Sequence, residues 1–256
     1  MPDRSARVWL AVGVLALAAA ACDPGGSRAR RNERREAREA DAAPYQADVD
    51  EGLGAAVAIL VDTSGSMRER VEGDSRPKYV VAREALEAML DATDAFVAKR
   101  PDFPIKIGIY SFSSSARRLR PIEGYDRAAI AAALDELPRP GGGTAIGDAM
   151  RVARPDLYHA GVFRKYIIVV TDGENTTGRS PNDVAREIWG KSEGAVQVYF
   201  VAFDTSPDKF AFLKDVGGDV FGAGTGVELR RALDGIYQGK ILAEAPAAAE
   251  REPARR

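Results

Sequence analysis

The sequence has few of the residues that most metal, redox and nucleophilic sites require, because it contains one cysteine, Cys22, and one histidine, His159. A disulfide scaffold, a zinc finger and a cluster of several thiolates are therefore excluded, and a histidine-based catalytic triad would depend on His159 alone. Neither sign of charge dominates, since 36 Lys and Arg are balanced by 38 Asp and Glu. We expect no nucleic-acid partner, because binding a phosphate backbone requires a basic face.

Long apolar runs are also scarce, and the first lies near the amino terminus. Arg4 and Arg7 precede an uncharged run over residues 8–21 that ends in small residues, which is the layout of a bacterial secretory signal peptide. The run is shorter than the roughly 20 residues that a membrane-spanning helix needs. Ala19-Ala20-Ala21-Cys22 resembles the lipobox of bacterial lipoproteins, which implies that Cys22 is acylated. A plain signal peptide that leaves an idle Cys22 is the alternative.

Composition divides the chain into four parts. Residues 1–21 are the predicted signal peptide, and residues 22–50 carry many charges and almost no large apolar side chains. Residues 243–256 consist mainly of Ala, Pro and charged residues. Neither of these last two segments can bury a core, so we expect a disordered tether and a disordered tail around a domain at residues 51–242. A lipid on Cys22 would hold that domain in the bacterial cell envelope, facing the periplasm or the exterior.

Short apolar runs within the domain predict the strands of a sheet. Residues 55–61, 166–170 and, apart from Gln197, 196–203 are apolar runs, which is typical of parallel strands covered on both faces. Residues 105–112 alternate in part. The polar segment 116–122 follows a short gap that suits a hairpin, so we expect an edge strand there.

Helices are expected between these strands. Apolar residues at three- and four-residue spacing predict an amphipathic helix that begins near Pro77 and ends before Pro101. Strands that alternate with helices define an α/β fold, a Rossmann-like three-layer sandwich with a doubly wound sheet. Further helices are predicted over residues 128–137, 146–158, 182–189, 207–216 and 227–242.

Three predicted strands end in an acid: Asp62, Asp172 and Asp204. In a doubly wound sheet, ligands bind beyond the carboxyl ends of the strands. Carboxylates gathered there repel one another unless a cation or a network of donors compensates. We therefore expect Asp62 and Asp172 to lie at a binding site. Asp204 precedes Thr205-Ser206-Pro207 and is interpreted as a turn or cap residue.

Hydroxyl groups accompany these carboxylates. Asp62-Thr63-Ser64-Gly65-Ser66 sets a carboxylate and two hydroxyls at i, i+2 and i+4, and Gly141-Gly142-Gly143 precedes Thr144 at the start of a predicted helix. Oxygen donors without nitrogen or sulfur suit Mg²⁺, Mn²⁺ or Ca²⁺ rather than zinc. Each hydroxyl taken alone could cap a helix instead. The five residues taken together favour a metal site.

These residues resemble a known site. Asp62-x-Ser64-x-Ser66, Thr144 before Ala145-Ile146, and Asp172 between Thr171 and Gly173 are similar to the metal-ion-dependent adhesion site of the von Willebrand factor A (VWA) domain family. The resemblance implies a mostly parallel central sheet with one antiparallel edge strand and helices on both faces. It also implies that Ser64, Ser66 and Thr144 ligate a divalent cation by their hydroxyls, while Asp62 and Asp172 act directly or through water. We expect Mg²⁺ first, with Mn²⁺ or Ca²⁺ as alternatives. A partner protein would supply an Asp or Glu carboxylate to the open coordination position.

Three residues near this set have open roles. Asp148 lies four residues after Thr144 and is either an acceptor behind the site or a surface charge. Glu174 and Asn175 follow Asp172 on an exposed loop and contact either a partner or solvent.

The leading hypothesis is a non-enzymatic, membrane-tethered module that binds protein partners through a divalent cation, without a small-molecule substrate or catalytic residues. The rival hypothesis is a Mg²⁺-dependent phosphotransferase or phosphatase-like enzyme that uses Asp62 as nucleophile. Such enzymes place a second Asp two residues after the nucleophile, where this chain has Ser64, and the chain has no phosphate-binding loop with Lys. A structural lipoprotein with a vestigial metal site is the third hypothesis.

Overall fold

The computed structural model describes residues 51–71 and 73–243. The predicted signal peptide, Cys22, the tether and the tail beyond residue 243 lie outside the described residues. Within the described part of the chain, no helix combines the length and the apolar character that crossing a membrane requires.

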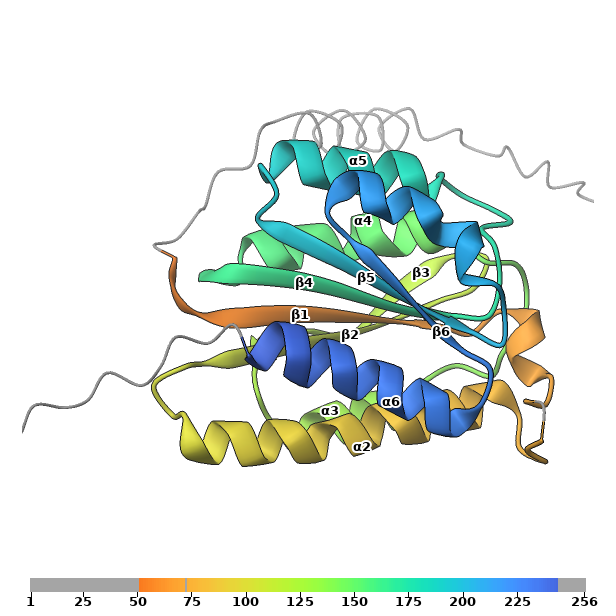
Figure 1. Cartoon of the computed structure of the whole chain (residues 1–256), viewed down its shortest axis with the longest axis horizontal. Helices are drawn as coiled ribbons and strands as arrows, with labels where there is room; N and C mark the ends of the chain where they lie inside the picture. Colours follow the sequence, from red (N-terminus) through yellow and green to blue (C-terminus); the bar gives the residue numbers. More distant parts are fainter. Residues whose placement is uncertain (1–50, 72, 244–256) are drawn as a thin grey trace, which may run out of the picture. The chain divides into compact units, whose positions relative to one another are not determined.

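The described residues form a six-stranded sheet with the order β3-β2-β1-β4-β5-β6 (Figure 1). All neighbouring strands are parallel except β2 and β3, so the predicted mostly parallel sheet with one antiparallel edge strand is confirmed. The strands are β1 (Gly52–Asp62), β2 (Ile105–Phe112), β3 (Ala116–Gly124), β4 (Val162–Thr171), β5 (Val196–Phe203) and β6 (Asp219–Ala223).

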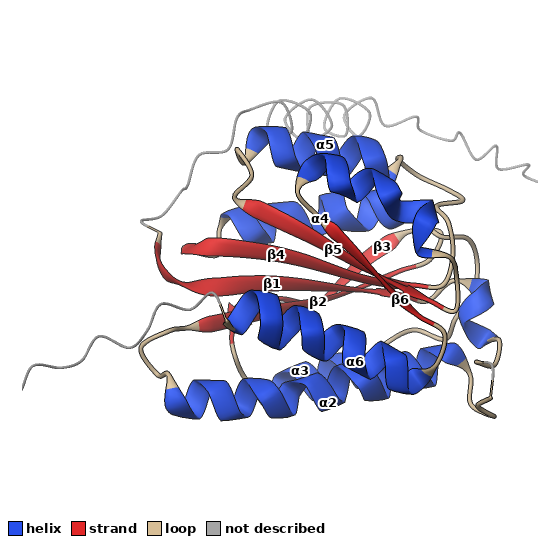
Figure 2. Cartoon of the chain, viewed as in Figure 1, coloured by secondary structure: helices blue, strands red, loops and turns tan. Residues whose placement is uncertain are grey.

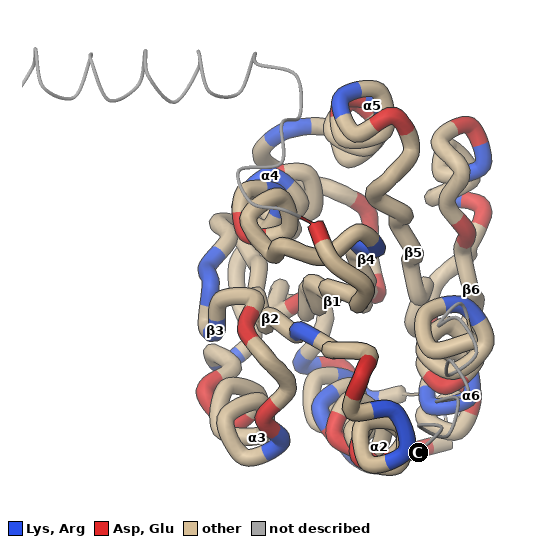
Figure 3. The backbone as a smooth tube through the Cα atoms, turned by 90° about the vertical axis from the view of Figure 1, so that its left-hand side faces the viewer, with Lys and Arg blue, Asp and Glu red and all other residues tan. Residues whose placement is uncertain are grey.

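Two layers of helices enclose the sheet (Figures 1 and 2). One face packs against α2 (Lys78–Lys99), α3 (Arg127–Asp135) and α6 (Gly226–Ile236). The other face packs against α4 (Ile146–Tyr158), α5 (Pro181–Lys191) and the 3-10 helix η2 (Pro207–Val216). Viewed along the strands, the charged residues lie mainly on the helices and loops that surround the sheet (Figure 3). The predicted three-layer sandwich is confirmed.

Successive side chains of β1 point to opposite faces of the sheet, and helices cover both faces, which explains why the sequence of β1 is apolar throughout. Val57, Ile59 and Val61 are buried in the core beneath α2, and Ala58 and Leu60 are buried in the core beneath α4. A strand between two helix layers has no solvent-facing side, which removes the usual polar alternation. β3 forms one edge of the sheet and keeps exposed polar residues, as expected.

Three parts of the secondary structure differ from the sequence-based expectation. β6 was not predicted, because the strand is only five residues long and most of its residues are not buried. The predicted helix over residues 207–216 is a 3-10 helix with a kink at Phe210. The predicted helix over residues 227–242 ends at Ile236 and continues as the π-helical segment η3 (Tyr237–Leu242).

The strand order reverses its direction between β1 and β4. From β1 the chain passes to β2 on one side, and β4 lies on the other side, so the winding direction of the sheet reverses between these strands. Ligands of doubly wound sheets bind at such reversals. Asp62 ends β1 and Asp172 follows β4, so the two carboxylates flank this position, and Asp204 follows the adjacent strand β5.

Candidate metal centre

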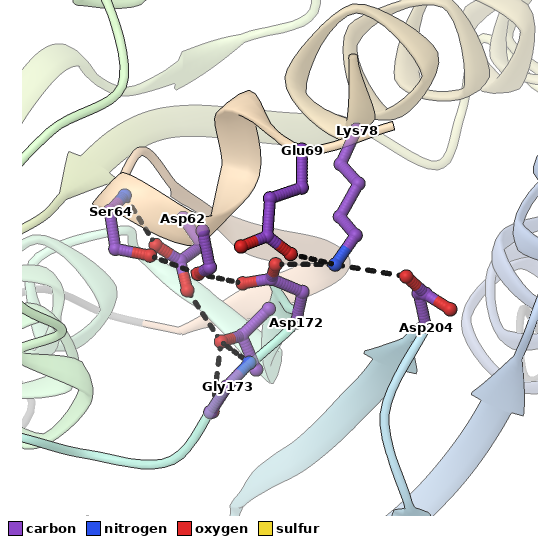
Figure 4. Close-up of polar contacts among 9 residues, drawn as sticks. Asp62, Ser64, Glu69, Lys78, Asp172, Gly173 and Asp204 are labelled. Carbon is purple, nitrogen blue, oxygen red and sulfur yellow. Dashed lines mark hydrogen bonds and ion pairs between the residues drawn. The ribbon is translucent and has the colours of Figure 1, made fainter. Parts of the chain in front are cut away.

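Hydrogen bonds within one loop and between two loops join four of the five predicted site residues. Ser66 Oγ donates to Asp172 Oδ1 at 2.7 Å, across 106 positions of sequence, and Ser64 Oγ lies 3.1 Å from Ser66 Oγ (Figure 4). The Ser64 backbone N–H donates to Asp62 Oδ1 at 2.7 Å. The structure therefore joins the side-chain oxygens of Ser64, Ser66 and Asp172 in one chain of contacts and holds the Asp62 carboxylate against the backbone of Ser64.

Thr144, the fifth predicted residue, is buried in a loop that packs beside the first one. Gly141 N–H donates to Thr63 O at 2.8 Å, and Gly65 N–H donates to Gly142 O at 3.1 Å. Gly142 has a φ of +79°, which is a conformation that favours glycine. The glycines thus allow the two backbones to approach closely. Neither of these bonds involves the Thr144 hydroxyl.

The capping interpretation of the hydroxyls is not realised. Ser64 precedes the short 3-10 helix η1 (Gly65–Arg68), and its side chain makes no cap hydrogen bond. The first N–H of α4, at Ile146, donates to Asn175 Oδ1 at 2.7 Å, so Asn175 caps this helix in place of Thr144. The sequence analysis expected Asn175 to contact a partner or solvent. In the structure its side chain caps α4 instead.

The segment after Asp172 also holds the Thr144 loop in place. Thr144 N–H donates to Thr176 Oγ1 at 2.8 Å, and Thr176 N–H donates to Thr144 O at 2.9 Å. Asp148 accepts from the N–H of Arg179 at 3.3 Å, so it supports this same segment from α4. The loops that carry Asp172 and Thr144 therefore form one hydrogen-bonded unit.

Asp62 is fully buried, and burial dominates its electrostatics. Desolvation disfavours the charged carboxylate and raises the pKa of Asp62 from 3.8 to about 6, although hydrogen bonds from Thr171 and Ser64 act in the opposite direction. Thr171 Oγ1 donates to Asp62 Oδ2 at 2.6 Å. Asp62 has no cationic side chain as a partner in the described contacts, so a bound cation would favour its ionised form.

Lys78, which the sequence did not predict to be at the site, contributes the local positive charge. Its ammonium lies 3.0 Å from Asp172 Oδ2, 2.9 Å from Asp204 Oδ2 and 3.6 Å from Glu69 Oε2 (Figure 4). Burial disfavours the ammonium, but the hydrogen bonds and charges of Asp204 and Asp172 outweigh it and raise the pKa of Lys78. Asp204 lies in a turn, as interpreted, and its carboxylate is also an ion-pair partner.

The donor set fits a hard divalent cation. Among residues 51–71 and 73–243, no group of three His, Cys, Asp or Glu side chains is placed to hold a metal ion. A cation between Asp62 and Asp172 would therefore depend on the hydroxyls of Ser64 and Ser66, with Thr144 in the adjoining loop. Hydroxyl and carboxylate oxygens are ligands that Mg²⁺ and Mn²⁺ accept. When bound, the cation would supply a positive charge at the carboxyl ends of β1 and β4.

Comparisons with known proteins agree with this architecture. Residues 57–174 match the family model described as von Willebrand factor type A domain, and this range contains all five predicted site residues. The fold, a mostly parallel six-stranded sheet with surrounding helices, is that of VWA domains. No curated protein sequence matches the chain.

Solved structures with the same fold share little sequence with the chain. The PilB minor pilin from Streptococcus sanguinis is 15% identical with a TM-score of 0.61, over 76% of this chain and 63% of the pilin. Proximal thread matrix protein 1 from the mussel byssus, in a structure with a zinc-occupied MIDAS motif, is 22% identical with a TM-score of 0.55, over 73% of this chain and 46% of that protein. BatB from Bacteroides thetaiotaomicron is 20% identical with a TM-score of 0.57, over 75% of this chain and 99% of BatB. The chain spans less than two thirds of the pilin and about half of the mussel protein.

Proposed function

We propose that this protein is a non-enzymatic binding module that captures an Asp or Glu side chain of a partner protein through a divalent cation. Asp62, Ser64, Ser66, Thr144 and Asp172 would hold the cation. The observation that carries the proposal is the chain of contacts from Ser64 Oγ through Ser66 Oγ to Asp172 Oδ1. It unites oxygen donors from two distant loops, and the serine hydroxyls in it are not used as helix caps.

The VWA fold supports this assignment, because VWA domains often mediate protein interactions through such a metal site. The mussel protein carries zinc in its motif, which supports a divalent cation in this kind of site. For this chain we propose Mg²⁺, with Mn²⁺ or Ca²⁺ as alternatives, because the donors are hard oxygens. We further propose that a lipid on Cys22 tethers the domain in the bacterial cell envelope, facing the periplasm or the exterior.

The enzyme hypothesis has no specific observation in its favour. The position two residues after Asp62 is Ser64, whose hydroxyl contacts Ser66 and cannot act as a general acid or base at neutral pH. Hydrolysis of p-nitrophenyl phosphate by the wild-type protein, lost in Asp62→Asn, would contradict the non-enzymatic assignment.

A peptide-display selection against the full chain tests the proposed function. Random peptides are selected once with Mg²⁺ and once with EDTA, and the bound peptides are then tested on the Ser66→Ala variant. We expect the Mg²⁺ selection to enrich peptides with an Asp or Glu that is needed for binding, and expect these to bind neither in EDTA nor to the variant. Arg139→Gln, which changes a charged residue in the loop before the glycines, is the control and should keep binding. Peptides that bind without metal, or without an acidic residue, would contradict the proposal.

A further inference from the structure

Lys78 occupies a position that is unfavourable for a lysine in two respects. Its side chain is only 6% exposed, so its charge is largely removed from water. It is the first residue of α2, and the positive end of a helix dipole disfavours a cation. The helix alone therefore does not explain a lysine at this position.

The surrounding carboxylates explain the position. Figure 4 shows the Lys78 side chain extending from α2 between Asp172 and Asp204, with Glu69 beside it. Asp204 has a φ of +53°, a left-handed conformation that is uncommon for a residue with a side chain. Its N–H donates to Ala223 O at 2.7 Å, which fixes the backbone in this conformation. The end of β5 is thus shaped to hold a carboxylate against the ammonium.

Both oxygens of Asp172 already have partners. Oδ1 accepts from Ser66 Oγ at 2.7 Å, and Oδ2 accepts from Lys78 Nζ at 3.0 Å. A divalent cation that approaches Asp172 therefore meets a positive charge already bound to the same carboxylate. The two cations repel each other, and this repulsion is strong where the surroundings are buried.

We propose that Lys78 is a tethered cation that neutralises Asp172 before metal binds and then competes with the divalent cation for that carboxylate. Asp204 is the acceptor that retains the ammonium when the metal takes Asp172. The inference rests on the proposed function in one respect, namely that a divalent cation binds at this site. It adds that the chain sets its own metal affinity low, so that a partner carboxylate contributes a larger share of the binding.

A purely positioning role for Lys78 would have the opposite sign. If Lys78 only held Asp172 in the orientation that a metal needs, its removal would weaken metal binding. Competition requires that its removal strengthens metal binding. The direction of the change in affinity therefore separates the two roles.

The test is a titration of the full chain with Mn²⁺, in which electron paramagnetic resonance measures the free ion. Lys78→Met removes the charge and keeps the length of the side chain, and we expect its dissociation constant to fall by about tenfold. Asp204→Asn removes one of the other carboxylates that pair with the Lys78 ammonium, so the ammonium stays bound to Asp172. We therefore expect weaker Mn²⁺ binding than in the wild type. Asparagine tolerates the left-handed conformation of residue 204, so the fold should be retained.

A double variant isolates the competition from general electrostatics. Asp204→Asn removes a negative charge and weakens Mn²⁺ binding to some extent in any background. We expect this loss to be smaller when Lys78→Met is also present, because no ammonium is then left to compete. Lys240→Met is the charge-matched control. Lys240 pairs with Asp219 at the amino-terminal end of β6, whereas the candidate site lies at the carboxyl ends of the strands. Its affinity for Mn²⁺ should equal that of the wild type.

The outcomes distinguish the two proposals. If the wild type binds Mn²⁺ and Lys78→Met binds it equally well or more weakly, the competition is refuted and the metal centre stands. Equal losses from Asp204→Asn in the presence and absence of Lys78 refute the competition as well. If neither the wild type nor any variant binds Mn²⁺ at millimolar concentration, the metal centre itself is refuted, and the competition with it.

Discussion

Replacing Asp62 with Asn is expected to stabilise the metal-free domain and to abolish its stabilisation by metal. The side chain is fully buried at the end of β1, and the pKa of its carboxyl is raised to about 6 because burial disfavours the charge. At pH 7.5 the folded protein keeps this group ionised at a free-energy cost. Asparagine has nearly the same shape and carries no charge, so that cost disappears.

The magnitude follows from the pKa and from the hydrogen bonds. A pKa raised from 3.8 to about 6 corresponds to about 3 kcal/mol of lost stability at neutral pH. The carboxylate accepts hydrogen bonds from Ser64 N–H and Thr171 Oγ1. Asparagine has one acceptor oxygen, so one of these bonds is lost or reversed, at about 1–2 kcal/mol. The net gain in metal-free stability is about 1–2 kcal/mol, which raises Tm by about 2–8 °C in a domain of this size.

The assay is thermal unfolding of the full chain in EDTA and across a Mg²⁺ titration. Wild type should gain about 1.4 kcal/mol when the free metal reaches about ten times Kd, and Asp62→Asn should gain nothing. Asp215→Asn is the control, because its carboxylate is exposed and pairs with Arg186 on the surface. Its stability should change by less than about 0.5 kcal/mol, with a normal response to Mg²⁺. A variant that is less stable than wild type in EDTA would refute the reasoning about the buried charge.

Three further predictions follow from particular contacts. First, the folded protein retains the proton of Asp62 to higher pH than the unfolded chain does, so this stabilising contribution is complete below about pH 3.8 and is lost as the pH rises through about 6. In EDTA, the stability advantage of Asp62→Asn should therefore disappear or reverse near pH 4, where relief of the buried charge no longer offsets the lost hydrogen bond, and an advantage that is constant from pH 4 to 7.5 would contradict the assignment. Second, Asn175→Ala removes the cap of α4 and should cost about 1 kcal/mol and weaken Mn²⁺ binding, whereas Asp126→Ala, which uncaps α3, should cost a similar amount and leave Mn²⁺ binding unchanged. Equal Mn²⁺ affinities of these two variants would show that the Asn175 cap does not support the site. Third, Gly142→Ala should destabilise the domain by about 1–3 kcal/mol and weaken Mn²⁺ binding, because the position has a positive φ and a Cβ would lie 2.5 Å from Ser114 Oγ. Gly235→Ala in α6, where a Cβ meets nothing within 4 Å, is the matched control and should be neutral or stabilising in thermal unfolding.

The sequence predicted most of the fold because the central strands are strongly apolar. Residues 105–112 and 196–203 were predicted as strands with the bounds that the structure has, and residues 146–158 were predicted as a helix with the observed bounds. β6 could not be recognised in the same way, because an edge strand of five partly exposed residues has no distinctive pattern. The transition from α6 to the π-helical segment leaves no signature in apolar spacing.

The site was predictable to the extent that it follows from strand ends. Asp62, Ser64, Ser66 and Asp172 meet because parallel strands bring their carboxyl ends to one edge of the sheet. The Asn175 cap and the Lys78 ion pairs depend on contacts between elements, which no local pattern encodes. One local signal for Lys78 did exist, because a lysine at the first position of a helix opposes the helix dipole and requires another reason to be there.

The central claim is that a divalent cation binds among the oxygens of Ser64, Ser66 and Asp172. The most direct measurement is a crystal structure of the full chain grown with Mn²⁺, with the anomalous difference map calculated at the manganese edge. The proposed function predicts a strong anomalous peak at the carboxyl ends of β1 and β4, in contact with these side chains. An intact site without an anomalous peak, at millimolar Mn²⁺, would contradict it.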